Sequence, residues 1–308
     1  MMDNTPQESR AALLVTRPTD PDTQGNILFS VVKDLSEDEY LRYRSAYNTL
    51  DGILIENLFT YYEHSFKSLC KLWRDTCNEF ATGPIKLDGH TSDSVDLGIR
   101  FRSAVLSLVS MLCYHQERTY DEICTKFGKD SPEHRAAKDI FGHLYDDYFG
   151  YRYLYKLRNV MIHDSIRTVT LTIEAHANHG NPIALVDLMM HRDSLIQSQK
   201  INPTLKAELA SKPGDPSILQ MAMEFHRALR NANSRLLSIM HPDLTEVCDT
   251  ILEFDKLYEE KDGVRGLIHQ QSPELRAPFT TGFVPWDGAV VMFARTYTTE
   301  EWLDPNDD

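Results

Sequence analysis

Three long helical segments occupy most of the first half of this chain, and they constrain its fold more than any other feature. The segment at residues 37–80 places its apolar side chains at the three-four spacing of one buried helical stripe. These side chains are Ile55, Leu58, Phe59, Tyr62, Phe66, Leu69 and Trp73. Residues 97–127 and 132–165 form the other two helical segments. Because apolar stripes on long helices must be buried against other elements, the sequence predicts an antiparallel helical bundle.

Capping signals mark the ends of these segments. Ser36 with Glu39 three residues later is a capping box, which predicts a helix start at residue 37. Gly128 ends the second helix, and Ser131 with Pro132 opens the third as cap and first helical residue. We expect a break near Gly150 within the third segment.

Strand patterns flank and interrupt the helices. Residues 11–17 and 27–33 predict an N-terminal β-hairpin, and the alternating segment 166–175 with 183–190 predicts a second. A third hairpin is expected from 279–284 and 289–296 around Pro285-Trp286-Asp287-Gly288. Further helices are expected at 203–210, 216–240 and 243–261. The predicted fold class is therefore α+β and mainly α, a helical bundle with added β-hairpins.

The predicted organisation has three parts on one large core. Residues 1–35 are the N-terminal hairpin extension, and 36–262 are the helical domain with an inserted hairpin at about 167–190. Residues 263–308 are a C-terminal hairpin and an acidic tail, packed on the same domain, with Trp286 and Phe293 either in the core or on a partner surface. A chain of 308 residues is long enough to bury a large core.

The composition indicates a cytoplasmic protein. Hydrophobic content of 42% and charged content of 25% are ordinary for a globular chain. The sequence has no run of about 18 apolar residues, so no membrane-spanning helix is expected, and its N-terminus does not follow the pattern of a secretory signal. Five cysteines, an odd number without a close C-x-x-C pair, are expected to be reduced thiols.

The net charge of −14 argues against broad, sequence-independent binding of nucleic acid. A basic island nevertheless lies at residues 151–167, where Arg152, Lys156, Arg158 and Arg167 stand against the single acid Asp164. The alternative is that this island is an ordinary solvated helix face. An acidic surface also suits a protein whose site is masked by a basic partner.

The island contains an arginine, an amide and a histidine at close spacing: Arg158, Asn159 and His163. A guanidinium holds phosphate through parallel charge-assisted hydrogen bonds, and an imidazole can move the proton of a 2′-hydroxyl near neutral pH. A second Arg/His pair at similar spacing, Arg235 and His241, is followed by Leu236 rather than an amide. The Arg158 set is therefore the stronger candidate for a metal-free RNA-cleaving site.

With these long helices and R-N-x-x-x-H at the end of the third, the chain resembles the HEPN superfamily of helical-bundle proteins, many of which are metal-independent endoribonucleases of toxin–antitoxin, abortive-infection and CRISPR systems. The resemblance covers residues 37–165 and one or two helices within 216–261. It is specific at Arg158, Asn159 and His163. The hairpins are additions to a minimal domain of this kind.

The resemblance implies a mechanism and partners. His163 acts as general base or acid, Arg158 stabilises the phosphorane and Asn159 orients its neighbours, which gives a 2′,3′-cyclic phosphate and a 5′-hydroxyl. Family members commonly pair two motifs in a homodimer. Toxins of the family that are regulated by a partner nucleotidyltransferase carry a tyrosine two residues after the histidine. This chain has Ser165 there, so that form of control is not expected, and an antitoxin or regulatory protein stays a candidate partner.

The expected substrate-binding residues are Lys156, Arg152, Arg167 and Tyr155, with RNA as substrate and no cofactor or metal. Tyrosines 148, 151, 153 and 155 can either stack on bases or lie in the core. His176, His179, Asp187 and His191 were considered as a metal site, and loop histidines without cysteine partners rarely form one. The runner-up function is a catalytically inactive HEPN-like module that binds RNA or a protein.

Overall fold

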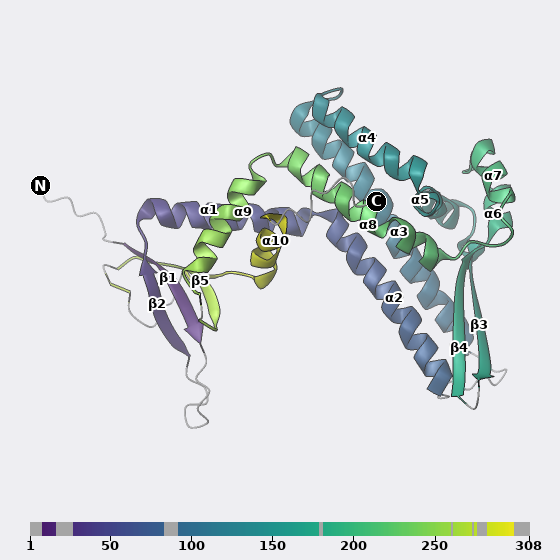
Figure 1. Ribbon diagram of the computed structural model, residues 1–308, viewed down its shortest axis with the longest axis horizontal. Coiled ribbons are helices and arrows are strands. Elements are labelled where there is room, and N and C mark those ends of the chain that lie inside the picture. The colour runs from purple at the N-terminus through teal and green to yellow at the C-terminus, as the bar shows by residue number, and fades with distance from the viewer. Residues whose placement is uncertain are drawn as a thin grey trace, which may run out of the picture. The chain divides into compact units, whose positions relative to one another are not determined.

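Residues 8–16, 27–82, 92–178, 181–259, 261–272, 274–275 and 282–298 are described by a computed structural model of the chain (Figure 1). Within them the fold is α+β and mainly helical, as predicted. The contacts divide the chain into two compact units. We call residues 1–56 with 241–308 the terminal unit, and residues 57–240 the central unit.

The strands and helices follow in chain order. They are β1 Ser9–Thr16, β2 Leu28–Asp34, α1 Glu37–Glu56, α2 Leu58–Thr82, α3 Ser92–Phe127, α4 Pro132–Asp147, α5 Phe149–His163, β3 Val169–Asn178, β4 Asn181–Met190, α6 Arg192–Gln197, α7 Pro203–Ala210, α8 Ile218–Met240, α9 Leu244–Lys256, β5 Val264–Gln270, β6 Val284–Pro285 and α10 Gly288–Thr298.

The terminal unit contains a four-stranded antiparallel sheet and the helices α1, α9 and α10. The strand order is β2-β1-β5-β6, so β1 pairs with both its sequence neighbour and a strand from the far end of the chain. Leu13 on β1 is fully buried, and Tyr258 donates its hydroxyl hydrogen to Gly266 O at 3.0 Å. Phe254 and Trp286 pack ring to ring with centroids 3.9 Å apart, which joins α9 to the segment before α10.

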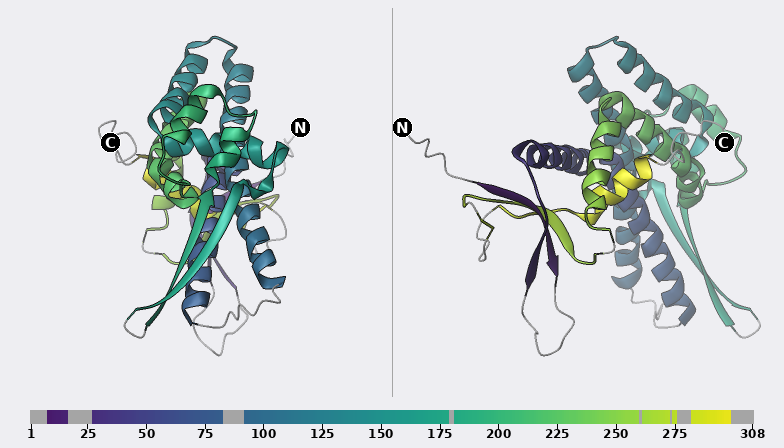
Figure 2. Two further views of the ribbon diagram at one scale, coloured as in Figure 1. Left: turned by 90° about the vertical axis from the view of Figure 1, so that its right-hand side faces the viewer. Right: turned by 60° about the vertical axis from the view of Figure 1, so that its left-hand side comes forward.

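The central unit is a helical bundle with a β-ribbon beside it. Helices α2, α3, α4, α5 and α8 share one apolar core. Its fully buried members include Leu69, Phe101, Leu108, Leu154 and Phe225. The ribbon β3–β4 runs alongside α2 in Figures 1 and 2, and the indole N–H of Trp73 donates to Val186 O at 2.7 Å. The bundle and ribbon together hold α5, the helix with the candidate residues.

One stretch of α3 stands out in the part of the chain that the structure describes. Val95–Phe127 is long and apolar enough to cross a membrane by length and composition, a test that a core helix of a soluble protein also passes. Phe101, Val105 and Leu108 from this stretch are fully buried in the bundle. Packing in the core therefore accounts for these three side chains, whereas Val95 and Ile99 at the start of the stretch are exposed.

Several predicted features are confirmed. Ser36 and Glu39 form a reciprocal capping box, with Ser36 N–H donating to Glu39 Oε2 at 2.9 Å and Glu39 N–H donating to Ser36 Oγ at 3.2 Å. Ser131 caps α4 by accepting the His134 N–H at 3.0 Å. The N-terminal hairpin and the inserted hairpin are both present as antiparallel pairs. In the inserted hairpin the first strand begins at Val169, three residues later than predicted, and the second begins at Asn181, two residues earlier.

Other predicted features are wrong. The helix expected at 37–80 is interrupted at Asn57, whose side-chain oxygen accepts the Phe59 N–H at 3.1 Å and so starts a new helix. The strand expected at 289–296 is helix α10, because Asp287 Oδ1 accepts the Ala289 N–H at 2.7 Å and caps it. Predictions for residues 279–281 and 303–308 lie outside the described residues.

The two ends of the chain come together in a way that the predicted boundaries do not show. Residues 1–35 and 263–308 are predicted as additions packed on one large helical domain, and β1 pairs with β5 from Ser9↔Gln270 to Val15↔Val264. The sheet therefore ties the two ends of the chain into the terminal unit together with α1 and α9. Long-range contacts define this grouping, both the pairing of β1 with β5 and the packing of α1 on α9, and contacts over such a separation leave no local signal in sequence.

His115 gives the central unit a pH-dependent stability. It is buried between Phe59 and Phe141, and burial lowers its pKa from 6.5 to about 4, although a hydrogen bond with Asn233 opposes the shift. The unfolded chain therefore takes up this proton first as pH falls below 6.5, so the stabilising effect is present above 6.5 and is lost toward pH 4. We expect the free energy of unfolding to fall by about 2 kcal/mol between pH 7 and pH 5 through this residue.

Urea denaturation of wild type and His115→Gln at both pH values measures this effect. Glutamine keeps a polar partner for Asn233 but does not titrate, so the variant should lose about 2 kcal/mol less than wild type over the same interval. The exposed His143→Gln is the control and should behave as wild type. Equal pH dependence in wild type and His115→Gln contradicts the prediction.

Candidate functional site

The candidate residues lie on α5, which is held in the bundle by one apolar face. Its buried residues recur at helical spacing. They are Gly150, Tyr151, Tyr153, Leu154, Leu157, Val160 and Met161. The remaining positions form two flanks of the helix. The helix ends at His163, where the Asp164 N–H donates to Val160 O at 2.9 Å.

The two flanks carry different parts of the motif. At about 100° per residue, Asn159 and His163 lie about 40° apart on one flank, together with Lys156. Arg158 lies about 140° from His163, on the flank that faces α3. Among the described residues, no hydrogen bond or ion pair joins Arg158 to His163. The structure therefore brings Asn159 and His163 together and sets Arg158 apart within one chain.

Arg158 is partly enclosed by α3. Its Nη1 lies 3.6 Å from Glu117 Oε1, and its side chain is 33% exposed. Its Nε is buried, and within the described part of the chain it has no hydrogen-bond partner. Burial raises the pKa of the neighbouring Cys113 thiol and Tyr155 hydroxyl to about 12, and the Arg158 charge opposes both shifts. One long ion pair thus positions the guanidinium of Arg158, and its remaining N–H groups can still donate hydrogen bonds.

His163 is exposed at the C-terminal end of α5. No described residue forms a hydrogen bond or an ion pair with its imidazole. A protonated imidazole at this end interacts favourably with the helix dipole. The next residue, Asp164, accepts a hydrogen bond from the Ser198 hydroxyl, which ties the end of α5 to the segment after α6. The imidazole is free to meet a ligand while its backbone is held in place.

Lys156 lies between two tyrosine rings. Its Nζ is 5.7 Å from the ring centroids of both Tyr145 and Tyr155. In the described part of the chain, neither Lys156 nor the exposed Arg167 forms an ion pair with a carboxylate. These two cations are therefore available for phosphate, and Tyr155 is half-buried beneath Lys156.

Arg152 does not fit the predicted substrate-binding role. Its Nη2 lies 2.7 Å from Glu208 Oε1, its Nη1 donates to Asp146 O at 3.0 Å, and its side chain is only 14% exposed. Tyr153 donates its hydroxyl hydrogen to Leu205 O and to Glu208 Oε2, at 2.6 and 3.0 Å. Arg152 therefore connects α5 to α7 and the end of α4, which is a structural role.

The tyrosines divide between core and surface. Tyr151 and Tyr153 are fully buried, and Tyr151 donates to Gln116 Oε1 at 2.8 Å. Tyr148 and Tyr155 are half-buried, the latter with its ring 6.3 Å from that of Tyr151. Base stacking on Tyr151 or Tyr153 would require the bundle to open, so Tyr148 and Tyr155 are the tyrosines of this set that a base could reach.

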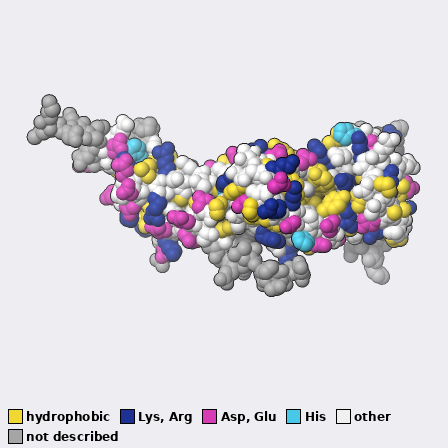
Figure 3. Space-filling view, turned by 90° about the horizontal axis from the view of Figure 1, so that it is seen from above, with side chains coloured by type: hydrophobic (Ala, Val, Ile, Leu, Met, Phe, Trp, Pro, Cys, Tyr) yellow, Lys and Arg dark blue, Asp and Glu magenta, His cyan; other side chains and the backbone are white. Residues whose placement is uncertain are grey.

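The charges around the site are mixed. On the face that Figure 3 displays, Asp and Glu side chains are interspersed among Lys and Arg, in keeping with the net charge of −14. In the described ranges, no three His, Cys, Asp or Glu residues form a group that could hold a metal ion. His191 Nδ1 lies 2.7 Å from Ser194 Oγ, and His179 of the considered metal set lies outside the described residues.

Two acidic residues that form ion pairs with arginines of α5, Glu117 and Glu208, were not predicted from the sequence. Each pairs with an arginine of α5 from a different helix, α3 or α7, so no local spacing reveals it. The second Arg/His pair is split between the units, with Arg235 in the central unit and His241 in the terminal unit. That split makes Arg235 a suitable control residue.

Comparison with protein-family models, with curated proteins and with solved structures found no match to this chain. The site must therefore be interpreted from its own chemistry.

Proposed function

We propose that this chain is a metal-independent endoribonuclease that acts as a toxin or anti-phage defence effector in the cytoplasm, with the HEPN-type set Arg158, Asn159 and His163 as its catalytic residues. The observation that supports this most is the exposed imidazole of His163 on the same flank as Asn159 and Lys156, at a fixed helix end. An imidazole there can exchange protons with a bound ribose, while Lys156 holds a phosphate.

The proposed reaction is an internal transfer. His163 takes the proton of a ribose 2′-hydroxyl, and the 2′-oxygen forms a bond to the adjacent phosphorus. The bond from phosphorus to the 5′-oxygen breaks, and that oxygen leaves with a proton from a general acid. Arg158 stabilises the negative charge that builds on the phosphorane oxygens. The products are a 2′,3′-cyclic phosphate and a 5′-hydroxyl.

One chain cannot supply Arg158 and His163 to the same phosphate, because the two lie about 140° apart around α5. We propose that a second copy, related by a twofold axis, completes the site. Exposed apolar side chains on α5, on the turn that follows it and on α3 suit such an interface. They are Ile162, Ile166 and Tyr114. In the dimer, Arg158 of one copy faces His163 of the other.

Incubating single-stranded RNA with the protein in EDTA tests the proposal. We expect cleavage by wild type with cyclic-phosphate ends, and a loss of about 100-fold or more in Arg158→Ala, because one charge-stabilising donor is removed. Arg235→Ala is the matched control, since it removes an exposed arginine of the other Arg/His pair, and it should cleave as wild type does.

The alternative is an inactive HEPN-like module that binds RNA or a protein partner. The ion pair between Arg158 and Glu117 favours it, because a guanidinium already engaged with a carboxylate is less available to phosphate. RNA binding by folded wild type without cleavage, across varied RNAs, supports the module and contradicts the enzyme.

A further inference from the structure

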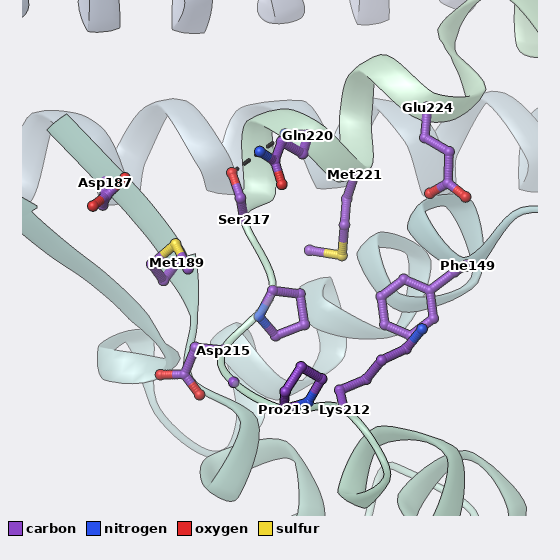
Figure 4. A pocket seen from close by; sticks show the side chains of 12 residues that line it. Phe149, Asp187, Met189, Lys212, Pro213, Asp215, Ser217, Gln220, Met221 and Glu224 are labelled. Atoms are coloured by element: carbon purple, nitrogen blue, oxygen red, sulfur yellow. Dashed lines mark hydrogen bonds between the residues drawn. The ribbon is translucent and has the colours of Figure 1, made fainter. Parts of the chain in front are cut away.

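A pocket of about 620 Å³ opens in the central unit between β4, the α7–α8 connection and the first turns of α5 and α8 (Figure 4). Its volume falls in the range of sites that take small organic molecules. None of its lining residues belongs to the proposed catalytic set. The pocket therefore needs an explanation of its own.

Three carboxylates line this pocket, each from a different element. Asp187 comes from β4, Asp215 from the α7–α8 connection and Glu224 from α8. Asp215 Oδ1 accepts the Arg192 N–H at 2.9 Å, and Glu224 Oε2 accepts the Gly150 N–H at 2.9 Å. These backbone bonds fix two of the carboxylates but neutralise neither. In the described part of the chain, no hydrogen bond or ion pair engages the Asp187 carboxylate.

Apolar side chains separate the three acids. The buried Met221 lies at the centre of the lining, with Met189 on one side of it and Phe149 on the other in Figure 4, and Pro216 also lines the pocket. The carboxylates belong to no group of described residues that could hold a metal ion together. The pocket thus suits positive charges that are spread apart and joined by an apolar chain, rather than one compact cation.

The pocket already contains one such amine. The Lys212 side chain lies in the lining with its Nζ 4.4 Å from the centroid of the Phe149 ring, a cation–π contact. Its four methylenes and terminal ammonium are the chemistry of an aliphatic amine. With three carboxylates and one ammonium among the lining residues, the formal charge of the site remains negative.

We propose that this pocket binds a linear aliphatic polyamine, with ammonium groups on Asp187, Asp215 and Glu224 and methylenes over Met189, Met221 and Pro216. Lys212 acts as an internal competitor that holds the Phe149 face when the ligand is absent. The ribonuclease proposal is not needed for this inference.

Titration calorimetry with spermidine at low ionic strength tests the proposal. Asp187→Asn and Glu224→Gln should each weaken spermidine binding about threefold, and together about tenfold, because each removes one exposed charge pair. Glutamine at 224 can still accept the Gly150 N–H, so the fold should be kept. Lys212→Met keeps the aliphatic chain without its charge and should strengthen binding about threefold.

Matched variants outside the pocket separate a site from general attraction to an acidic protein. Asp121→Asn on α3 and Lys200→Met, both exposed, should leave spermidine affinity unchanged. Magnesium chloride at the same ionic strength should not displace spermidine. Equal effects of pocket and control variants, displacement by magnesium, or no binding to folded wild type would overturn the proposal.

Discussion

Replacing His163 by alanine is expected to lower the rate of RNA cleavage by about 10²- to 10⁴-fold, the range that a general acid or base contributes. The residue is exposed at the end of α5 and contacts no buried group, so its loss should leave the free energy of unfolding within about 0.5 kcal/mol of wild type. A large loss of cleavage rate in a variant that is as stable as wild type would show that His163 acts in the chemical step and not through the fold.

Single-turnover cleavage of a labelled RNA in EDTA measures this loss, with circular dichroism and denaturation as checks on the fold. His143→Ala is the control: it removes a surface histidine of α4, with its Nδ1 3.6 Å from Asp147, and should cleave at the wild-type rate. Equal rates for wild type and His163→Ala would exclude the imidazole from the reaction.

Mixing two inactive variants tests whether the site spans two copies. A dimer of Arg158→Ala with His163→Ala still holds one arginine and one histidine, on different chains. If these two groups meet across the interface, the mixture should recover part of the wild-type rate, up to about half in mixed dimers. No recovery, with mixed dimers shown to form, would require both groups to come from one chain and contradict the geometry of α5.

Local signals explain which parts of the fold could be predicted. Ser36 with Glu39 and Ser131 with Pro132 form their caps within one helical turn, so the residues that make the contact are also adjacent in sequence. The inserted hairpin is local in the same way, since its strands are sequence neighbours. Composition and periodicity therefore sufficed for the mainly helical class.

One long-range strand pairing and two local caps explain what the sequence did not predict. The pairing of β1 with β5 joins Ser9 to Gln270, and neither strand carries a mark of its partner. Helix α10 was taken for a strand because Val290 and Val291 favour strands, whereas the Asp287 cap decides the outcome in favour of a helix. The interruption at Asn57 was hidden by a continuous apolar stripe.

In the candidate site, too, the local features could be predicted from the sequence and the contacts between helices could not. The spacing of Arg158, Asn159 and His163 was visible in sequence, and so was the end of the helix. The charges that act on α5 were not, because Glu117 and Glu208 come from α3 and α7. Arg152 and Lys156 look alike in sequence, yet one is tied to Glu208 and the other lies between two tyrosine rings.

Gly150→Ala should destabilise the central unit by about 3 kcal/mol, the upper part of the range for overpacking. A Cβ at this position would lie 2.2 Å from Met221 O, a backbone atom of α8, and 2.8 Å from Glu224 Oε2. Alanine favours helix over glycine by about 1 kcal/mol, which is too little to offset the clash. The contact can be relieved only by moving α5 away from α8, which opens the shared core.

Gly142→Ala on α4 is the matched control for this effect. A Cβ there meets nothing within 4 Å, so the same substitution should stabilise the helix by about 0.5 to 1 kcal/mol. Urea denaturation of the two variants should therefore shift the midpoint in opposite directions. Two stabilising shifts would mean that α5 and α8 do not approach as closely as Gly150 indicates, and the position of α5 in the bundle would have to be revised.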